Sequence, residues 1–498
     1  MIWTVSYLVV LFGLALFGLH RYFILYLYWK HRDNRPQPAS FFARLPVVTV
    51  QLPIYNEVFV AGRLLRAVGK IDYPRDRLEI QVLDDSQDET CEIVDREAAS
   101  LRERGFDVVV LRRKVREGFK AGALDAGLRV AKGEFLMILD ADFLPSCTIL
   151  QETIHFFGDP NVGMIQTRWG HHNRSYSWLT RAQAILLDGH LVLEQTGRSR
   201  SGRFFNFNGT AGVWRRSCIE AAGGWQADTL TEDLDLSYRA QLCGWHFLFL
   251  ADTVTPAELP VDMTAFRSQQ HRWTKGSIQT CLKLLPRVWQ SPLPLKIKLE
   301  ATIHLTSNFS YLLLALLCVL LSPATGAMAG GESLTRALLI DLPLFAGTTC
   351  SVAIFYLSAQ RVLYPNAWLR EIFFFPFVLA LGVGVSVSNA RAVLEALCGH
   401  RSEFSRTPKY GVGSSAQHKR QRRYLVLRSA VPVVEILFAA YFTRFVFLAF
   451  QSHEFLSLPF LMLFQFGFTY VAVSSVWELA VRVRQRETNL PISFDSLA

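Results

Sequence analysis

Three clusters of acidic and polar residues each stand directly after a short β-rich run of the sequence. Their members are Tyr55 and Glu57, then Asp84 and Asp85, then Asp140 and Asp142. Carboxylate oxygens are the ligands that hard divalent cations prefer, and an Asp-x-Asp pair leaves coordination positions open for phosphate oxygens. We therefore predict that Asp140 and Asp142 bind Mg²⁺ or Mn²⁺, with the metal acting as a Lewis acid on a departing diphosphate.

The residue types around this pair suit a nucleotide diphosphate. Tyr55 can stack on a base, and Asp84 can accept a hydrogen bond from a base or a ribose. Lys120 can reach a phosphate as a point charge, although on its own it is typical of a solvated lysine at a helix start. An isolated Asp-x-Asp is weak evidence, because turns after strands favour Asp in any case. Three such clusters in order favour a functional interpretation.

Two further motifs lie downstream. Thr231-Glu232-Asp233 precedes a helical stretch at 234–242. A carboxylate near a helix start is favoured in its ionised form, which makes Asp233 a candidate general base. The alternative is a capping Thr followed by acidic residues of the first turn. The sequence pattern leaves both interpretations open.

The second downstream motif contains Gln269, Arg272 and Trp273, whose spacing places them on one face of a helix. Arg can pair with a diphosphate, and Trp can stack on a sugar ring. A generic amphipathic helix produces the same spacing, so the pattern alone does not assign a role.

The elements that must position these residues alternate between strand and helix. The β-rich runs are 47–52, 79–83, 107–111, 135–139 and 163–167. The helical patterns between them are 57–69, 88–104 and 118–131. Strands separated by helices predict an α/β fold with a mostly parallel sheet and helices on both faces. Ligands bind outside the carboxyl ends of such strands, so the three clusters should converge on one edge.

The composition of the 498 residues is uneven. Hydrophobic residues make up 51% and include 37 Phe, yet residues 30–298 are ordinary globular sequence and the long apolar runs lie at both ends. The net charge of +10 does not indicate a nucleic-acid partner, because no binding motif is present and basic residues flank the apolar runs. The eight Cys include no CxxC pair, which argues against a disulfide framework or a zinc site.

The first 29 residues are long and apolar enough to cross a bilayer and too long for a signal-peptide core. Basic residues follow at once, which predicts that the next domain is cytosolic. We thus predict a transmembrane helix at 1–29 and a cytosolic domain at 30–298 with interfacial helices towards its end. We also predict a C-terminal membrane region at 299–481, which contains a cytosolic loop at 391–424. A cytosolic tail follows at 482–498.

Five apolar runs fall in the C-terminal region, near 303–322, 337–358, 372–390, 425–450 and 456–480. A cytosolic domain and a cytosolic tail require an even number of crossings between them. Basic residues flank the run 372–390 on both sides, so we predict that it lies at the interface or re-enters. The alternative is a fifth crossing that leaves the tail outside.

Taken together, the motifs resemble those of the inverting glycosyltransferases of A-type fold that include cellulose, chitin and hyaluronan synthases. The matching motifs, in order, are Asp84-Asp85, Asp140-x-Asp142, Thr231-Glu232-Asp233 and Gln269-x-x-Arg272-Trp273. The resemblance covers residues 45–280. The stretches 207–215 and 269–273 look most like those of the cellulose synthase-like mannan and xyloglucan-backbone synthases.

The resemblance implies an A-type glycosyltransferase domain inserted in a transmembrane bundle, as in a multi-pass protein of the bacterial inner membrane or its equivalent. It implies transfer of a hexose from UDP-glucose or GDP-mannose onto a growing β-linked glycan, with export through the protein's own helices. Transfer of one sugar to a lipid acceptor is the first alternative. A non-enzymatic transporter is the second, but it leaves the carboxylates of the α/β domain without a role. Donor, linkage and oligomeric state stay open.

The resemblance also implies roles for individual residues. Asp233 would be the catalytic base, and Asp140 with Asp142 would hold the metal. The residues expected to bind the nucleotide sugar are Tyr55, Glu57, Asp84, Asp85, Lys120, Asp140, Gln269 and Arg272. The residues expected to bind the acceptor are Asn208, Gly209, Thr210, Glu232 and Trp273. The stretch 404–409 resembles the mobile gating loop of cellulose synthase, except that Arg406 stands where an apolar residue is usual.

Overall fold

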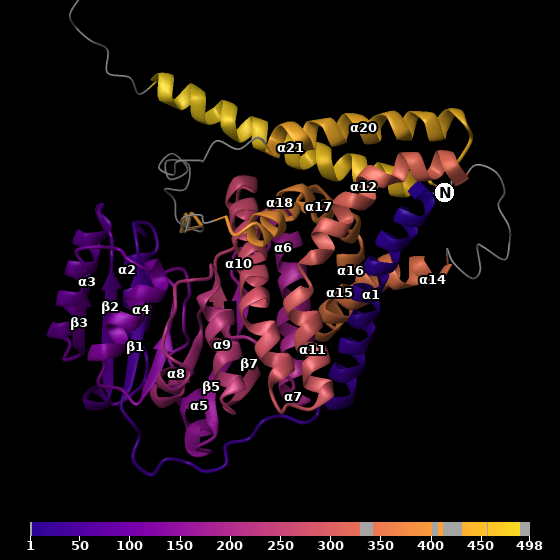
Figure 1. Ribbon diagram of the computed structural model, residues 1–498. Coiled ribbons are helices and arrows are strands. Elements are labelled where there is room, and N and C mark those ends of the chain that lie inside the picture. Colours follow the sequence, from indigo (N-terminus) through magenta and orange to yellow (C-terminus); the bar gives the residue numbers. More distant parts are fainter. Residues whose placement is uncertain (1, 329–341, 401–406, 412–430, 456, 489–498) are drawn as a thin grey trace, which may run out of the picture.

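The structure, a computed structural model, describes residues 2–328, 342–400, 407–411, 431–455 and 457–488. Most of the loop at 391–424, the start of the gating-loop motif at 404–406 and the end of the tail at 489–498 lie outside the described residues. An α/β unit occupies one side of the molecule and a group of long helices the other (Figure 1).

The α/β unit is built on a seven-stranded sheet in the order β3-β2-β1-β4-β6-β5-β7. The strands are β1 (Val48–Ile54), β2 (Leu78–Asp84), β3 (Asp107–Leu111), β4 (Phe135–Ile138), β5 (Val162–His171), β6 (Gly212–Arg215) and β7 (His246–Ala257). Only β6 runs antiparallel to its neighbours in this sheet, β4 and β5; the other pairings are parallel. The predicted mostly parallel sheet is confirmed.

Helices cover both faces of this sheet, as predicted. One hydrophobic core includes Leu64 of α2, Val94 of α3 and Ile149 of α5, and the other includes Leu124 of α4 and Leu236 of α9. The side chains of β4 alternate between these two cores, as the pleat of a strand requires. The helices here are α2 (Ala61–Val68), α3 (Thr90–Glu103), α4 (Phe119–Val130), α5 (Ile149–Ile154), α8 (Arg216–Ala221) and α9 (Glu232–Leu242).

A second set of helices joins the sheet to the apolar side of the molecule. It consists of α6 (Trp178–Asp188), the π-helical turn η3 (Gly189–Glu194), α7 (Gln195–Arg200) and α10 (Met263–Gln290). The helix α10 contacts α9 of the α/β unit and also α11, α18 and α21 of the apolar side. It therefore connects the two parts of the molecule directly.

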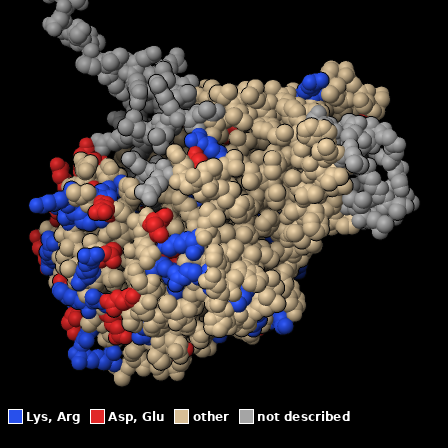
Figure 2. Space-filling model, in the orientation of Figure 1, with Lys and Arg blue, Asp and Glu red and all other residues tan. Residues whose placement is uncertain are grey.

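The remaining helices belong to the apolar regions. They are α1 (Ile2–His31), α11 (Leu295–Thr306), α12 (Phe309–Met328), α14 (Leu342–Phe345), α15 (Ser351–Leu363), α16 (Leu369–Ile372), α17 (Phe375–Gly384), α18 (Ser386–Leu397), α20 (Val431–Gln451) and α21 (Leu458–Thr488), with a π-helical turn at Ala346–Cys350. The charged side chains gather on the α/β unit, whereas the helical side shows few of them on the face drawn in Figure 2.

Three helices in the described part are long and apolar enough to cross a membrane: α1, α20 and residues 458–478 of α21. Two bent pairs, α11 with α12 at 53° and α17 with α18 at 41°, raise the number to five if each pair is one span. The apolar run 372–390 falls in the second pair, which is either a broken span or a re-entrant segment. Its predicted re-entry stays a prediction.

Two details differ from the simple segment pattern of the sequence. The run 337–358 does not give a long helix in its described part; it forms α14, a π-helical turn and the start of α15. The helix α1 continues to His31, two residues beyond the predicted span, and its last turns pack against the connecting helices η3 and α7. There Ile24, Leu27 and Tyr28 join a core with Val192 and Leu193 of η3.

Candidate active site

A pocket opens at the carboxyl ends of β1 and β4, and α9, α10 and the segment 407–411 close its other sides. The pocket is open to solvent, and its empty space, solvent at the mouth included, is about 1230 Å³. Most predicted site residues line it: Tyr55, Glu57, Asp85, Lys120, Asp140, Asp142, Asn208, Gly209, Glu232, Asp233, Gln269, Arg272 and Trp273. Motifs separated by more than 200 residues in the sequence thus meet in one place.

Asp84 and Thr210 are predicted site residues that do not line the pocket. The Asp84 carboxylate is buried at the end of β2, where it accepts hydrogen bonds from Arg112 Nε at 2.9 Å and from the Ser86 backbone N–H at 3.1 Å. Asp85 faces the pocket instead and pairs with Arg113 at 2.5 Å. The Thr210 hydroxyl accepts a hydrogen bond from the Asp140 backbone N–H at 2.8 Å, so it helps to hold the backbone of Asp140 in place.

The carboxylates of the Asp-x-Asp pair each face an ammonium group. Asp140 Oδ1 lies 2.6 Å from Lys120 Nζ, and Asp142 Oδ2 lies 2.5 Å from Lys409 Nζ. Asp142 is buried, and its Oδ1 has no hydrogen-bond partner among the described residues. An anionic oxygen left without a donor in a buried position is costly unless a cation or a ligand completes its surroundings.

This donor set fits a divalent cation that substrate phosphates help to hold. The described residues contain no group of three or more His, Cys, Asp or Glu side chains that would bind a metal alone. Mg²⁺ is usually bound in proteins by one or two carboxylates, with phosphate and water oxygens as its other ligands. Asp140 and Asp142, whose Oδ1 has no hydrogen-bond partner among the described residues, are the predicted carboxylate ligands for such a cation.

Asp233 lies at the start of α9, next to the buried Glu232. Burial raises the pKa of Asp233 to about 7 and the Glu232 charge adds to this, while Lys120 and the Leu234 backbone N–H, 2.8 Å away, act in the opposite direction. The helix-start effect expected from the sequence is therefore outweighed by burial. A carboxyl group with a pKa near 7 is well suited to accept a proton at neutral pH.

Gly209 allows the chain to approach this carboxylate closely. Its φ of +83° lies in the region that favours glycine, and a Cβ at this position would stand only 2.9 Å from Asp233 Oδ2. The Gly209 carbonyl oxygen also accepts a hydrogen bond from Lys120 Nζ at 2.8 Å. The stretch 207–210 thus forms the wall of the pocket beside the candidate base.

Two cations lie among the acidic groups. Lys120 contacts Asp140 and stands 4.0 Å from Glu232. Burial of Lys120 disfavours its charge, but Asp140 and Glu232 outweigh this and raise its pKa. Burial lowers the pKa of Arg272, opposed by Glu232, Asp140 and Asp233. Both side chains line the pocket, where they can stabilise the charge of a diphosphate.

The helix α10 carries Gln269, Arg272 and Trp273 into the pocket, as their spacing predicted. Its N-terminus is fixed by the Asp262 side chain, which accepts from the Ala265 backbone N–H at 2.7 Å. Glu478 of α21 adds a second cap and accepts from the backbone N–H groups of Met263 and Thr264 at 2.8 and 3.1 Å. The position of α10 therefore depends on a helix of the apolar region.

Several pocket residues were not predicted from the sequence. The Arg116 guanidinium lies 3.5 Å from the centre of the Tyr55 ring and covers the face that was expected to stack on a base. Glu258, at the end of β7, accepts from the Tyr410 backbone N–H at 2.8 Å and so holds the segment 407–411 against the pocket. Position directly after a strand was an available signal for Glu258, which follows β7.

Comparison with known proteins places this arrangement in a family. The family model for "Glycosyltransferase like family 2" matches residues 46–276, which include all four motifs. "Glucomannan 4-beta-mannosyltransferase 7" of Arabidopsis thaliana is 34% identical over 476 residues, covering 90% of this chain and 81% of that protein.

Other plant relatives match over a shorter part. "Glucomannan 4-beta-mannosyltransferase 2" of Arabidopsis thaliana is 40% identical over 274 residues, and "Glucomannan 4-beta-mannosyltransferase 1" of Oryza sativa subsp. japonica is 39% identical over 282 residues. These matches cover 53% and 56% of this chain. They span about half the length of each relative, 51% and 53%.

Among solved structures, the mannosyltransferase PcManGT of Pyrobaculum calidifontis superposes with a TM-score of 0.54 at 20% identity, covering 79% of this chain and all of that one. This likeness establishes a shared fold, the A-type glycosyltransferase fold. The shared fold agrees with the family indicated by the long match to the mannosyltransferase 7 of Arabidopsis. The chain belongs to the family 2 glycosyltransferases, alongside the plant glucomannan 4-beta-mannosyltransferases.

Proposed function

We propose that this chain transfers a hexose from a nucleotide diphosphate sugar, with inversion at the anomeric carbon, onto the growing end of a β-linked glycan. The observation that carries the proposal is the meeting of Asp233, whose pKa is near 7, with Lys120, Arg272 and the Asp140-x-Asp142 pair in one pocket. We favour GDP-mannose as the donor over UDP-glucose, because the similar plant proteins are named for mannosyl transfer. PcManGT was solved with GDP-Man and Mn²⁺.

In this mechanism Asp233 accepts the proton of the attacking hydroxyl. The hydroxyl oxygen forms a bond to the anomeric carbon from the face opposite the nucleotide, and the bond from that carbon to the phosphate oxygen breaks. Lys120 and Arg272 stabilise the negative charge that develops on the leaving diphosphate. Asp140 and Asp142 hold the divalent cation, which when bound supplies Lewis-acid stabilisation of that same charge.

We further propose that transfer is processive and that the product leaves along the membrane helices. Each unsatisfied hydroxyl of a glycan in hydrocarbon is costly, so a growing chain needs a protein-lined path. The acceptor face of α10 is close in sequence to such a path, because α10 ends at Gln290 and α11 begins at Leu295. The α/β unit is cytosolic in this proposal, where nucleotide sugars are available.

A donor panel tests the proposal. Membranes that contain the full chain are incubated with radiolabelled GDP-mannose, UDP-glucose and GDP-glucose, with Asp233→Asn membranes as the matched control. We expect label from GDP-mannose in a polymer that a β-mannanase degrades, and none in the control. Label found only as one sugar on a lipid would replace the polymer with the lipid acceptor, and no transfer from any donor would reject the activity.

A further inference from the structure

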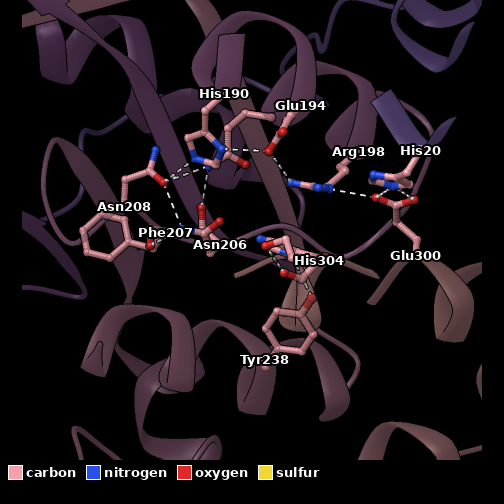
Figure 3. A network of polar contacts seen from close by, with 12 residues as sticks. His20, His190, Glu194, Arg198, Asn206, Phe207, Asn208, Tyr238, Glu300 and His304 are labelled. Atoms are coloured by element: carbon pink, nitrogen blue, oxygen red, sulfur yellow. Dashed lines mark hydrogen bonds and ion pairs between the residues drawn. The ribbon is translucent and has the colours of Figure 1, made fainter. Parts of the chain in front are cut away.

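A chain of buried polar contacts runs from the helix α1 to the pocket and uses residues that the mechanism leaves without a role (Figure 3). It begins at His20 of α1, whose Nε2 lies 3.0 Å from Glu300 of α11. Arg198 of α7 donates from Nε to Glu300 at 2.9 Å and from Nη1 to Glu194 at 3.0 Å. Arg198 and Glu300 are each 2% exposed, so neither charge is solvated by water.

The chain then reaches the pocket through His190. His190 Nδ1 lies 3.0 Å from Glu194 Oε2, and its Nε2 lies 3.2 Å from Asn208 Oδ1. Both His190 and Glu194 belong to η3, and π-helical turns inside α-helices often mark functional sites. Asn208 lines the pocket and directly precedes Gly209, which lies against the Asp233 carboxylate.

The orientation of the Asn208 amide follows from its other neighbours. Gln195 Nε2 donates to the Asn206 carbonyl oxygen at 2.9 Å, and Asn206 Nδ2 donates to the Phe207 carbonyl oxygen at 3.1 Å. Backbone carbonyls can only accept, so both of these amides present N–H groups towards Asn208. Each of them lies 2.9 Å from Asn208 Oδ1. The atom of Asn208 that faces this cluster is therefore its oxygen.

This arrangement turns the Asn208 amide nitrogen away from the cluster, as Figure 3 shows. The nitrogen is buried and has no hydrogen-bond partner among the described residues. A buried N–H₂ group without an acceptor is unfavourable, so the site is complete only when a ligand oxygen accepts from it. A neutral amide donor suits a neutral hydroxyl or ether oxygen, which are the groups of a sugar chain.

His190 completes the fixation of this amide. Because Asn208 Oδ1 can only accept, the contact at 3.2 Å is a hydrogen bond when the proton of the His190 ring is on Nε2. Without the ring, Asn208 Oδ1 retains two donors among the described residues, the side-chain amides of Gln195 and Asn206. The ion pairs through Arg198 to Glu300 and His20 continue this network to α11 and α1.

We propose that His190 is a positioning residue for the acceptor. It holds the Asn208 amide with its nitrogen directed at an oxygen of the terminal acceptor sugar, next to the hydroxyl that Asp233 deprotonates. The inference rests on the proposed function, because it requires a glycan acceptor. It assigns no role in donor binding, so it predicts an effect on one substrate only.

The test measures the two substrates separately on the full-length enzyme. Transfer from radiolabelled GDP-mannose to a soluble β-linked mannan oligosaccharide gives the KM of each substrate, and release of GDP without an acceptor gives hydrolysis by water. We expect His190→Ala to raise the acceptor KM about tenfold, the loss expected for one hydrogen bond, with donor KM and hydrolysis within twofold of wild type. His190→Gln restores a donor towards Asn208 and should recover most of the acceptor affinity.

Two further variants make the result decisive. His20→Ala breaks a contact at the far end of the same network without touching Asn208, so it should lower the unfolding temperature and leave the acceptor KM unchanged. Asn208→Asp keeps the oxygen that accepts from the cluster but removes the N–H₂ group, and should raise the acceptor KM as much as His190→Ala or more.

Equal effects of His190→Ala and His20→Ala, or a raised donor KM in His190→Ala, would overturn the inference and leave the network purely structural. If His190→Ala does not fold, an unchanged acceptor KM in Asn208→Asp would overturn it by itself. A wild-type enzyme that transfers to no acceptor would instead reject the proposed function. The two failures are therefore distinguishable.

Discussion

At the scale of single residues, the protonation of the groups in the pocket depends on charges that lie close together. Asp233, Glu232 and Asp140 are acidic, Lys120 and Arg272 are basic, and all five line one pocket. Opposite charges at close distance in a poorly solvated place determine which groups are protonated. The pKa values of Asp233 and Lys120 therefore depend on the acidic and basic groups around them.

The first prediction concerns the base. Asp233→Asn keeps the size of the side chain but removes the proton acceptor, and a positioned general base contributes about 10²–10⁴-fold in rate. We expect kcat to fall by that factor while the donor dissociation constant changes little. Single-turnover kinetics with saturating donor, together with equilibrium donor binding, measure the two quantities. Weak donor binding with normal turnover at saturation would make Asp233 a binding residue.

The second prediction concerns pH. A base works only when deprotonated, so the raised pKa of Asp233, about 7, predicts that kcat increases with pH through the neutral range. The Glu232 charge contributes to this raised pKa, and Glu232→Gln should therefore shift the ascending limb of the kcat profile to lower pH. Profiles of wild type and variant over pH 5–9 measure the shift. If the ascending limb of the kcat profile does not shift in Glu232→Gln, a group other than Asp233 determines the pH dependence of kcat.

The third prediction concerns the metal. We expect EDTA to abolish transfer, Mg²⁺ or Mn²⁺ to restore it, and Asp142→Asn to remove nearly all activity, because the buried Oδ1 of Asp142 has no hydrogen-bond partner among the described residues. Isothermal titration of Mn²⁺ in the presence of GDP supplies a readout independent of turnover. Full transfer in chelator would contradict the assignment of the Asp140-x-Asp142 pair.

At the scale of elements, the pocket depends on where strands end and how closely two helices pack. Gly276 of α10 faces Thr231 at the start of α9, and a Cβ there would lie 2.6 Å from the Thr231 side chain and 2.8 Å from its backbone nitrogen. This contact keeps the helix that carries Arg272 and Trp273 at a fixed distance from Asp233. Small residues at such a crossing set the separation of the helices.

The fourth prediction follows from this contact. Gly276→Ala forces α10 and the start of α9 apart, and overpacking of this kind costs about 1–3 kcal/mol. We expect a lower unfolding temperature and a loss of transfer of about tenfold or more, because a small misplacement of catalytic groups strongly affects the rate. Gly382→Ala is the matched control, since a Cβ at Gly382 meets nothing within 4 Å. Equal behaviour of the two variants would contradict the argument.

Periodicity and turn residues predicted the first five strands and the helices α2, α3 and α4, but α5 and the strands β6 and β7 were missed. The strand β6 has only four residues, and Trp214 among them is buried. So short a segment does not show the alternation of buried and exposed residues that marks a strand. The sequence also could not predict which of Asp84 and Asp85 lines the pocket. Neighbouring residues of a strand point to opposite sides, so only the place where β2 ends decides which carboxylate reaches the pocket.

The close pairs across long sequence separations were equally unpredictable. The contact of Lys409 with Asp142 joins residues far apart in the chain, as does that of Glu478 with the start of α10. Such pairs depend on how the helical side packs against the α/β unit, and no local pattern encodes this. The four motifs were predicted because each keeps its chemistry within two to five consecutive residues.

At the scale of the whole molecule, the catalytic pocket lies beside helices that can cross a bilayer, and the two parts share α10. The direction in which these helices cross decides on which side the pocket lies. In the proposed arrangement the α/β unit, the segment 407–411 and the end of α15 all lie in the cytosol. The membrane then separates the donor from the exported product.

Side-specific labelling provides the fifth prediction. Single cysteines placed at Arg361 and Lys409 in a cysteine-free background should both react with an impermeant maleimide only from the cytosolic side, because the bent pair α17–α18 then enters and leaves on one side. Labelling from opposite sides would show that this pair crosses the membrane. A cysteine at Arg129, on the exposed surface of α4, reports the side of the α/β unit.

The length of the helix α1 has a consequence for where the α/β unit lies relative to the bilayer in this arrangement. At 1.5 Å per residue its 30 residues form a rod about 45 Å long, whereas the hydrocarbon core of a bilayer is about 30 Å thick. The remaining two to three turns are the ones that pack on η3 and α7. A stiff rod, unlike a flexible tether, fixes the height of the catalytic unit above the lipid. In the proposed arrangement, a change in bilayer thickness is therefore expected to shift α1 relative to η3, the turn that carries His190.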